Sequence, residues 1–205
     1  MAKMYFFYSV MNAGKTTLLL QTAHNYRENG GRVLVITSAM DNRSGVGVVS
    51  SRIGLKAEAA ALSTGDDLFD FVARENDRDP VTAVLMDEVQ FMSRDQIWQA
   101  SDVVDELNIP VLAYGLKNNY QGDIFSPAVS ALLALSDKIS ECKQLCHCGA
   151  KATMILKYDA SGVPIKSGDV VEIGGEEKYV SVCRKHWKKG DIGEAARSRI
   201  APKAA

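Results

Sequence analysis

The stretch FFYSVMNAGKTTLLL, residues 6–20, joins an apolar run to a tight turn and then to a second apolar run. The first run stops at Ser9, the turn ends in Gly14-Lys15-Thr16, and we interpret the second run as a helix. Between a strand and a helix, the backbone N–H groups of such a turn converge on phosphate oxygens. The stretch therefore predicts a nucleotide-binding loop at the start of an α/β domain.

The polar side chains of this loop would have different roles in holding a phosphate chain. Lys15 would place a charge near the β- and γ-phosphates, and Thr16 would offer its hydroxyl to Mg²⁺. Ser9 stands where the pattern usually has its first glycine, which points to a particular subfamily. Without its context, the motif would be only a helix start with an exposed lysine.

Length and composition exclude several classes of protein. A chain of 205 residues is long enough for one α/β domain with a real core and a small appendage. Its net charge of -1 and scattered basic residues argue against a nucleic acid polymer as partner. The apolar residues before the loop are too few for a signal peptide or a membrane span. We expect a cytoplasmic protein whose four cysteines are metal ligands or free thiols.

Short apolar runs alternate with helical stretches in the first part of the chain, which predicts a parallel sheet wrapped by helices. Residues 38–65 show no firm periodicity and are predicted to form a mobile loop. The expected strands are 4–8, 32–37, 81–86 and 111–114, and the expected helices are 15–29, 66–75 and 93–107.

The residue composition changes near residue 142, where cysteines, glycines and short β-like runs replace the alternation of apolar runs and helical stretches. We therefore predict a P-loop nucleotide-binding α/β domain over 1–141 and a smaller β-rich domain over 142–190. Residues 191–205 are predicted to be a disordered tail.

The second informative stretch is AVLMDEVQF, residues 83–91. Its apolar residues fit a buried parallel strand whose carboxyl end presents Asp87 and Glu88 beside the phosphate loop. Asp87 is suited to Mg²⁺, and Glu88 can accept a proton from a nucleophile. A strand end with two solvated acids is the plainer alternative. If Glu88 activates water, the protein is an ATPase, and if it activates an alcohol, it is a kinase.

A third group of residues has the composition of a zinc site. Two close pairs of soft ligands, separated by a β-rich stretch, are typical of a structural zinc that closes a small loop-rich unit. Cys142 and His147 compete for assignment, although Cys142 lies in a strand-like run where a small core residue is expected. The predicted ligands are Cys146, Cys148, Cys183 and His186.

The order of these motifs resembles the thymidine kinases of the cytosolic vertebrate and bacterial type. The segments SVMNAGKT, MDEVQF, GLKNNYQGDIF, the Cys-x-Cys element and IGGEEKYVSVCRKH carry the resemblance, which covers residues 4 to 187. It implies a RecA-like P-loop sheet and a zinc-binding domain whose residues 155–180 form a lasso over the nucleoside. It also implies ATP-dependent phosphorylation of the thymidine 5′-hydroxyl, a homotetramer and feedback inhibition by thymidine triphosphate.

The resemblance also implies roles for matching residues, with Glu88 as the catalytic base and Lys15 as a second catalytic group. Core packing remains an equal alternative for Leu116. The implied ATP and Mg²⁺ site comprises Ser9, Met11, Asn12, Ala13, Gly14, Lys15, Thr16, Asp41, Arg43, Asp87 and Gln90. The implied nucleoside site comprises Phe91, Leu116, Tyr120, Phe125, Val170 and Tyr179.

Two positions depart from the vertebrate pattern. The Cys-x-Cys spacing is one residue shorter, and Ile155 stands where vertebrate members carry a threonine near the base. Two other functions are kept as alternatives. One is a P-loop ATPase whose zinc unit docks a protein or nucleic acid partner, and the other is a non-catalytic nucleotide sensor.

Overall fold

A computed structural model of the chain describes residues 1–41, 45–171 and 178–200. The chain divides into two compact units. Unit 1 consists of Met1–Tyr8, Gly14–Leu116 and Ser126–Cys142, and unit 2 consists of Ser9–Ala13, Lys117–Phe125 and Lys143–Ala205. The division into domains at residues 141 and 142 stays a prediction. None of the helices in the described ranges combines the length and apolar character that crossing a bilayer requires.

Unit 1 is built on a six-stranded sheet with the strand order β5-β2-β6-β7-β1-β8. Strand β2 pairs in parallel with β5 and β6, β6 with β7, and β1 with β8. The strands are β1 (Met4–Ser9), β2 (Val33–Ser38), β5 (Ala60–Leu62), β6 (Ala83–Asp87), β7 (Val111–Leu116) and β8 (Lys138–Glu141).

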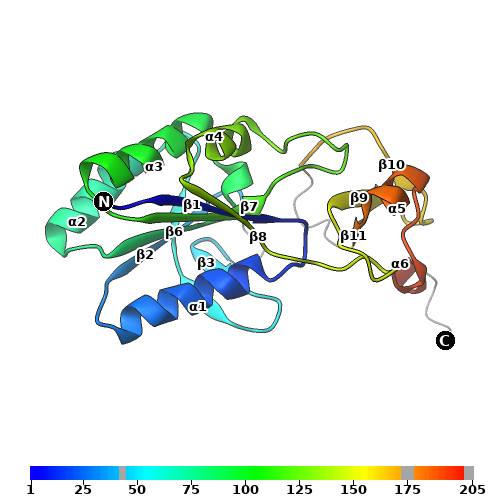
Figure 1. The fold of residues 1–205 in the computed structure, drawn as a ribbon, viewed down its shortest axis with the longest axis horizontal. Helices are drawn as coiled ribbons and strands as arrows, with labels where there is room; N and C mark the ends of the chain where they lie inside the picture. The colour runs from blue at the N-terminus through cyan, green and yellow to red at the C-terminus, as the bar shows by residue number, and fades with distance from the viewer. Residues whose placement is uncertain (42–44, 172–177, 201–205) are drawn as a thin grey trace. The chain divides into compact units, whose positions relative to one another are not determined.

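Helices cover both faces of this sheet, with α1 on one face and α2, α3 and α4 on the other (Figure 1). Local signals fix where they begin: Ser93 and Gln96 form a capping box for α3, and Asp67 caps α2. The helices are α1 (Lys15–Glu28), α2 (Leu68–Arg78), α3 (Arg94–Glu106) and α4 (Pro127–Leu135), with the 3-10 turn η1 at Val89–Phe91.

The core against α1 follows the period of two that a strand imposes on its side chains. Alternate residues of β2, β6 and β7 point to this face and meet Leu19, Leu20 and Ala23 of α1. The strand residues are Val33, Val35, Ala83, Leu85, Leu112 and Tyr114. All five residues of β6 are buried, as expected for a central strand covered on both faces. The predicted fold class, a parallel sheet flanked by helices, is confirmed.

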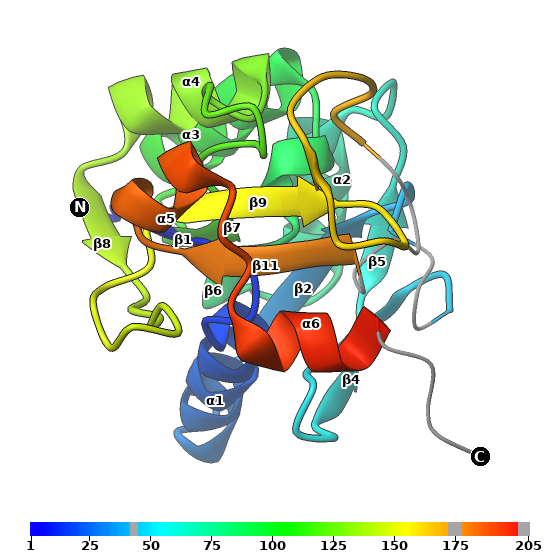
Figure 2. The same cartoon turned by 90° about the vertical axis from the view of Figure 1, so that its right-hand side faces the viewer.

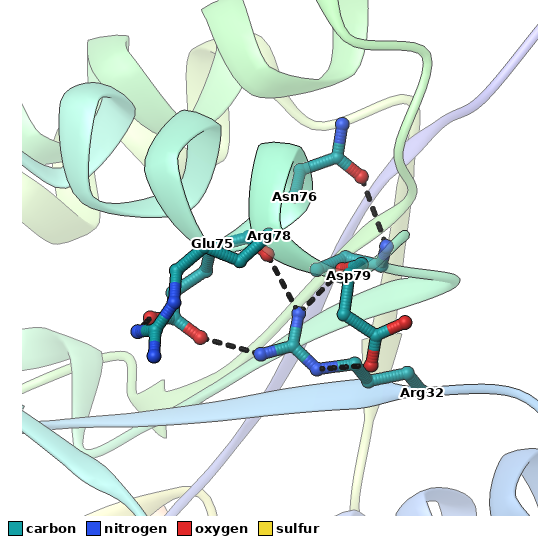
Figure 3. A network of polar contacts seen from close by, with 6 residues as sticks. Arg32, Glu75, Asn76, Arg78 and Asp79 are labelled. Atoms are coloured by element: carbon teal, nitrogen blue, oxygen red, sulfur yellow. Dashed lines mark hydrogen bonds and ion pairs between the residues drawn. The ribbon is translucent and has the colours of Figure 1, made fainter.

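A polar network joins the C-terminal end of α2 to the residue before β2 (Figure 3). The Arg32 guanidinium donates to the carbonyls of Glu75 and Asp79, at 2.8 and 2.6 Å, and contacts the carboxylates of both residues. Arg78 contacts Glu75 at 2.9 Å, and the side chain of Asn76 accepts from the backbone N–H of Val81. Hydrogen bonding to Arg32 lowers the pKa of Glu75. The network gives a donor to the carbonyl of Asp79, the C-cap of α2, and a second donor to the carbonyl of Glu75, which also accepts from the Asp79 N–H at 3.2 Å.

The prediction of a loop over 38–65 is wrong in part. Strands β3 (Val48–Ser50) and β4 (Lys56–Glu58) form an antiparallel pair, and β5 extends the main sheet beside β2. Each strand has three residues, which is too short to show a period in the sequence. No element was predicted over 127–141, where α4 and β8 lie.

Unit 2 contains a three-stranded antiparallel sheet with the order β10-β9-β11, and Figure 2 shows β9 and β11 side by side. The strands are β9 (Met154–Tyr158), β10 (Pro164–Ile165) and β11 (Tyr179–Val182), and the helices are α5 (Arg184–Lys189) and α6 (Glu194–Ile200). Helix α6 corrects the prediction that the whole segment 191–205 is disordered. Residues 201–205, and residues 172–177 of the predicted lasso, lie outside the described residues.

Candidate active site

The phosphate loop has the backbone of an anion-binding turn. Asn12 and Gly14 adopt left-handed conformations, with φ of 63° and 78°. Asparagine and glycine are the residues that tolerate this region best. Gly14 is also the N-cap of α1, and the first turn of this helix carries neither a side-chain cap nor an acidic residue. Its N-terminal N–H groups and dipole are therefore suited to an anion.

Ser9 fits the position of the usual glycine by turning its hydroxyl onto the backbone. Its side chain is buried, and its Oγ donates to the carbonyl of Val10 at 2.6 Å. The carbonyl of Ser9 accepts from the backbone N–H of Lys117 at 3.4 Å. The departure from the pattern is thus accommodated by a small, buried side chain whose hydroxyl bonds to the carbonyl of the next residue.

In unit 1, Thr16 at the start of α1 meets Asp87 at the carboxyl end of β6. The Thr16 hydroxyl donates to Asp87 Oδ2 at 3.0 Å. Burial, and then the charge of Glu88, raise the pKa of Asp87 to about 7, although Lys15 and the Thr16 hydrogen bond act in the opposite direction. Lys15 is 7% exposed and Asp87 is 3% exposed. A half-buried hydroxyl beside a buried carboxylate that lacks full charge compensation fits the oxygen ligands of Mg²⁺.

Glu88 is held in a conformation that ordinary residues avoid. It has φ 49° and ψ 39°, and its backbone N–H donates to Asp87 Oδ1 at 3.0 Å. A non-glycine residue in this region costs on the order of 1 kcal/mol or more, and such residues cluster at functional sites. The turn places consecutive carboxylates of Asp87 and Glu88 at the end of the central strand.

Gln90 connects Glu88 to the neighbouring strand. Its side-chain amide donates to the Glu88 carboxylate, and its Oε1 accepts from the backbone N–H of Leu116 at 3.0 Å. Gly115 makes room for this contact, because a Cβ there would lie 2.7 Å from Gln90 Oε1 and 2.6 Å from Val89. A direct contact of Gln90 with nucleotide stays a prediction. Sequence reasoning missed Gly115, although a glycine inside an apolar strand is a signal of close approach.

The residues predicted to hold the nucleoside are divided between the units. Phe91 and Leu116 belong to unit 1, and Leu116 is buried. Tyr120, Phe125, Val170 and Tyr179 belong to unit 2. The rings of Tyr120 and Tyr179 lie 6.2 Å apart, and Nζ of the buried Lys157 lies over both, at 5.1 and 5.7 Å. Sequence reasoning missed Lys157, since a lone lysine in a strand carries no signal.

Asp41 and Arg43 were also predicted to contribute to the donor-phosphate site. The backbone N–H of Asp41 donates to the carbonyl of Ser38 at 3.0 Å, and its role toward phosphate stays a prediction. Arg43 lies outside the described residues.

The predicted zinc ligands come together in unit 2. The ligand atoms of Cys146, Cys148, Cys183 and His186 lie within 4.8 Å of one another. His186 Nδ1 is 3.3 Å from the sulfur of Cys146 and 3.4 Å from that of Cys183. A tetrahedral zinc with ordinary bond lengths separates sulfur and nitrogen ligands by about 3.5 Å. The cluster thus has the composition and dimensions of a zinc site.

Cys142 and His147, which compete for this assignment, have different surroundings. The backbone N–H of Cys142 donates to the carbonyl of Tyr8 in unit 1, and Cys142 is outside the cluster. The rings of His147 and His186 are tilted by 30°, with 4.3 Å between their centroids. Asp191 lies 3.7 Å from His147 and 4.0 Å from His186, and these three residues form a second group that could hold a metal ion. The backbone N–H of His186 lowers the pKa of Cys183, which favours the thiolate that a metal requires.

Comparison with known proteins identifies the family. The family model described as thymidine kinase matches residues 2–187. A thymidine kinase of Ruegeria pomeroyi is 51% identical, over 94% of this chain and 98% of the relative. Thymidine kinases of Vibrio cholerae and Escherichia coli O157:H7 are 51% and 49% identical, over 92% of this chain and 98% and 92% of their own lengths. The chain belongs to the thymidine kinase family. The resemblance that the five sequence motifs indicated is thus confirmed.

For a thymidine kinase, the described geometry provides the parts that phosphoryl transfer needs. These are a phosphate loop, a hydroxyl and carboxylate pair suited to Mg²⁺, and a second carboxylate in a fixed orientation. The Cys/His cluster that could hold zinc is a separate feature of unit 2.

Proposed function

We propose that this chain transfers the γ-phosphoryl group of ATP to the 5′-hydroxyl of thymidine, and less efficiently of deoxyuridine, in nucleotide salvage for DNA synthesis. Family membership supports the reaction and the substrates. The structural observation that carries the proposal is Glu88, fixed by Gln90 and by Asp87 directly after the Thr16–Asp87 pair. A fixed carboxylate at this place suits a hydroxyl nucleophile.

On the donor side, the phosphate loop holds ATP through its backbone N–H groups, and Lys15 stabilises charge on the β- and γ-phosphates. Thr16 and Asp87 are the residues that would hold Mg²⁺. Bound Mg²⁺ supplies neutralisation of the charge that develops on the transferred phosphoryl group. Asp87 needs this cation, because its burial otherwise favours protonation.

On the acceptor side, Glu88 takes the proton of the 5′-hydroxyl as the new O–P bond forms and the bond to the β-phosphate oxygen breaks. The products are thymidine monophosphate and ADP. The hydrogen bond from Gln90 and the backbone of η1 hold Glu88 in one orientation, which lowers the cost of positioning it during the reaction.

Zinc in the cluster of unit 2 has a structural role in this proposal. Cys146 and Cys148 precede β9, and Cys183 and His186 follow β11, so the metal closes the segment between them. That segment contains the lasso, whose backbone around Tyr179 pairs with the thymine base. A metal that joins ligands so distant in sequence offsets the cost of ordering the intervening loop.

Three further features belong to the proposal. Thymidine triphosphate is a feedback inhibitor, since it combines the base of the acceptor with the triphosphate of the donor. The active form is a homotetramer, as the resemblance to the family implies. The enzyme works in the cytoplasm, where ATP is available and zinc-binding thiolates stay reduced.

Incubation with γ-labelled ATP and Mg²⁺, with and without thymidine, tests the function. We expect labelled thymidine monophosphate and little ATP hydrolysis without nucleoside. Hydrolysis that does not depend on thymidine would favour the ATPase alternative. Nucleotide binding without turnover under either condition would favour the sensor.

A further inference from the structure

Two side chains of the zinc-bearing unit donate hydrogen bonds to consecutive carbonyls of the phosphate loop. Ser181 Oγ donates to the carbonyl of Met11 at 2.7 Å, and Gln144 Nε2 donates to the carbonyl of Asn12. All four residues belong to unit 2. The donors lie far from the loop in sequence, and nothing in the loop motif itself indicates them.

Each donor is itself fixed by its surroundings. The backbone N–H of Leu145 donates to Gln144 Oε1 at 2.8 Å, which turns the amide nitrogen of Gln144 toward its other partner. The carbonyl of Gln144 accepts from Ala152 at 2.8 Å. Ser181 lies in β11, where it pairs with Ile155 of β9. Both side chains are thus held before any ligand arrives.

The planarity of the peptide bond transmits these contacts to the other side of the loop. In a trans peptide, the carbonyl of one residue and the N–H of the next point in opposite directions. Fixing the Met11 carbonyl therefore fixes the N–H of Asn12, and fixing the Asn12 carbonyl fixes the N–H of Ala13. These N–H groups belong to the segment whose left-handed Asn12 gives the loop its anion-binding form.

The position of the donors ties them to the Cys/His cluster. Gln144 stands two residues before Cys146, and Ser181 stands two residues before Cys183. The cluster brings these two cysteines within 4.8 Å of each other. A metal at the cluster therefore fixes the spacing of the segment that carries Gln144 and the strand β11 that carries Ser181.

We propose that Gln144 and Ser181 are positioning residues of the donor-phosphate site, and that metal binding at the Cys/His cluster holds them in place. The inference rests on the proposed function, in which the loop holds ATP. In this arrangement the metal supports nucleotide affinity as well as the order of the lasso. The two residues act on phosphate through the loop backbone and do not contact the substrate themselves.

Nucleotide affinity of the zinc-loaded protein, measured by calorimetry with ATP and Mg²⁺ without nucleoside, tests the positioning role. We expect Ser181→Ala and Gln144→Ala each to raise the Kd for ATP by about 5- to 10-fold, because each variant loses one hydrogen bond to the loop. Ser181→Thr keeps the hydroxyl and suits a strand, so its Kd should stay near that of the wild type. Ser198→Ala, an exposed serine of α6, is the matched control with unchanged affinity.

Kinetic constants separate positioning from a general loss of structure. The KM for ATP should rise in both variants, whereas the KM for thymidine and the melting temperature stay close to the wild-type values. Unchanged ATP affinity in both variants would overturn the proposal. An equal loss of affinity for both substrates would also overturn it. These results compare variants with the wild type, so they stand apart from the labelled-ATP test of the reaction itself.

Metal removal tests the link to the cluster. Chelation should lower the ATP affinity of the wild type more than that of the Gln144→Ala/Ser181→Ala double variant, because the double variant has already lost the contacts that the metal supports. The same fold-loss in both proteins would show that the metal does not act through these residues, and that part of the proposal would be wrong.

Discussion

At the scale of single residues, the site concentrates features that are unfavourable for folding. Asp87 is a buried carboxylate whose pKa is raised to about 7, and Glu88 has a left-handed backbone. In the proposed function both features serve the chemistry, because Asp87 would hold Mg²⁺ and the turn at Glu88 orients its carboxylate. Variants at these positions should therefore separate stability from activity.

Asp87→Asn should stabilise the nucleotide-free protein in a pH-dependent way. A folded pKa raised above the unfolded value means that the folded state holds a proton which the unfolded state releases. Stability from Asp87 is full below about pH 4 and is lost as the pH rises through about 7. At pH 8 we expect the variant to gain about 1–3 kcal/mol in the free energy of unfolding, given about 1.4 kcal/mol per pKa unit. Urea unfolding in Mg²⁺-free buffer measures it.

The gain of Asp87→Asn should disappear near pH 4, where the wild-type side chain is already neutral. The same variant should lose kinase activity, since an amide is a poor ligand for Mg²⁺. A variant less stable than the wild type at pH 8 would contradict the account of a destabilising buried charge.

Glu88→Gln should lose turnover and keep nucleotide binding. The amide cannot accept the proton of the 5′-hydroxyl, and a positioned base contributes about 10²- to 10⁴-fold to the rate. The Gln90 side-chain amide, which donates to the Glu88 carboxylate, would also face an amide at residue 88 in the variant. Single-turnover kinetics and ATP calorimetry test the two parts. A kcat within tenfold of the wild type would assign the base to another residue.

At the scale of elements, sequence periodicity predicted the central strands of the main sheet and the helices α1, α2 and α3. It did not predict the edge strands β5 and β8. The strand and helix around the phosphate loop were predicted because strong local signals, a buried apolar run and a glycine turn, coincide there. Strand β5 was missed because its pairing with β2 depends on a tertiary neighbour. The ligand set of the cluster was predictable from residue chemistry, whereas Gln144 and Ser181 act through contacts that no sequence spacing reveals.

The network around Arg32 should stabilise unit 1 through the end of α2 (Figure 3). Arg32→Met keeps an apolar stem and removes donors to two helix carbonyls and two carboxylates. We expect the melting temperature to fall by about 2–5 °C. Arg74→Met is the control, since the Arg74–Asp70 pair is exposed on the same helix and should contribute little. Equal shifts in both variants would contradict the capping role of Arg32.

At the scale of the whole molecule, the chain combines a unit with a parallel sheet and a second unit closed by the Cys/His cluster. Unit 2 takes residues from three parts of the chain, which are Ser9–Ala13 of the phosphate loop, Lys117–Phe125 after β7, and Lys143–Ala205. The assembly of unit 2 from three parts of the chain could not be predicted from the sequence. The change in residue composition near residue 142 marks only the longest of these parts. Because Ser9–Ala13 belong to unit 2, the proposal assigns part of the donor-phosphate site to that unit.

Removing a zinc ligand should therefore affect function before it unfolds the sheet of unit 1. We expect elemental analysis to give about one zinc per chain. Cys183→Ser should lose the metal and weaken thymidine binding, while circular dichroism of the α/β elements changes little. Protein purified without chelators that contains no metal would contradict the assignment. Thymidine affinity of Cys183→Ser at the wild-type level would contradict the role of the metal.

In the proposed function, the choice of nucleoside follows from the polarity of the pairing edge of the base. Thymine and uracil present acceptor, donor and acceptor, whereas cytosine presents a lone pair where a fixed backbone carbonyl expects the N3 proton. An unmatched buried polar group costs about 1–3 kcal/mol, and sites built on such contacts reject wrong partners by up to roughly 10⁵-fold. Deoxyuridine lacks only a methyl group, worth about 0.8 kcal/mol of apolar burial.

The central claim, that this chain is a thymidine kinase, is tested most directly by kcat/KM for thymidine, deoxyuridine, deoxycytidine and deoxyadenosine at saturating Mg-ATP. We expect kcat/KM to be highest for thymidine and within about tenfold of that value for deoxyuridine. For deoxycytidine and deoxyadenosine it should be lower by about 10³-fold or more. Phosphorylation of deoxycytidine within tenfold of thymidine would contradict both the pairing of the base with the lasso backbone and the proposed function.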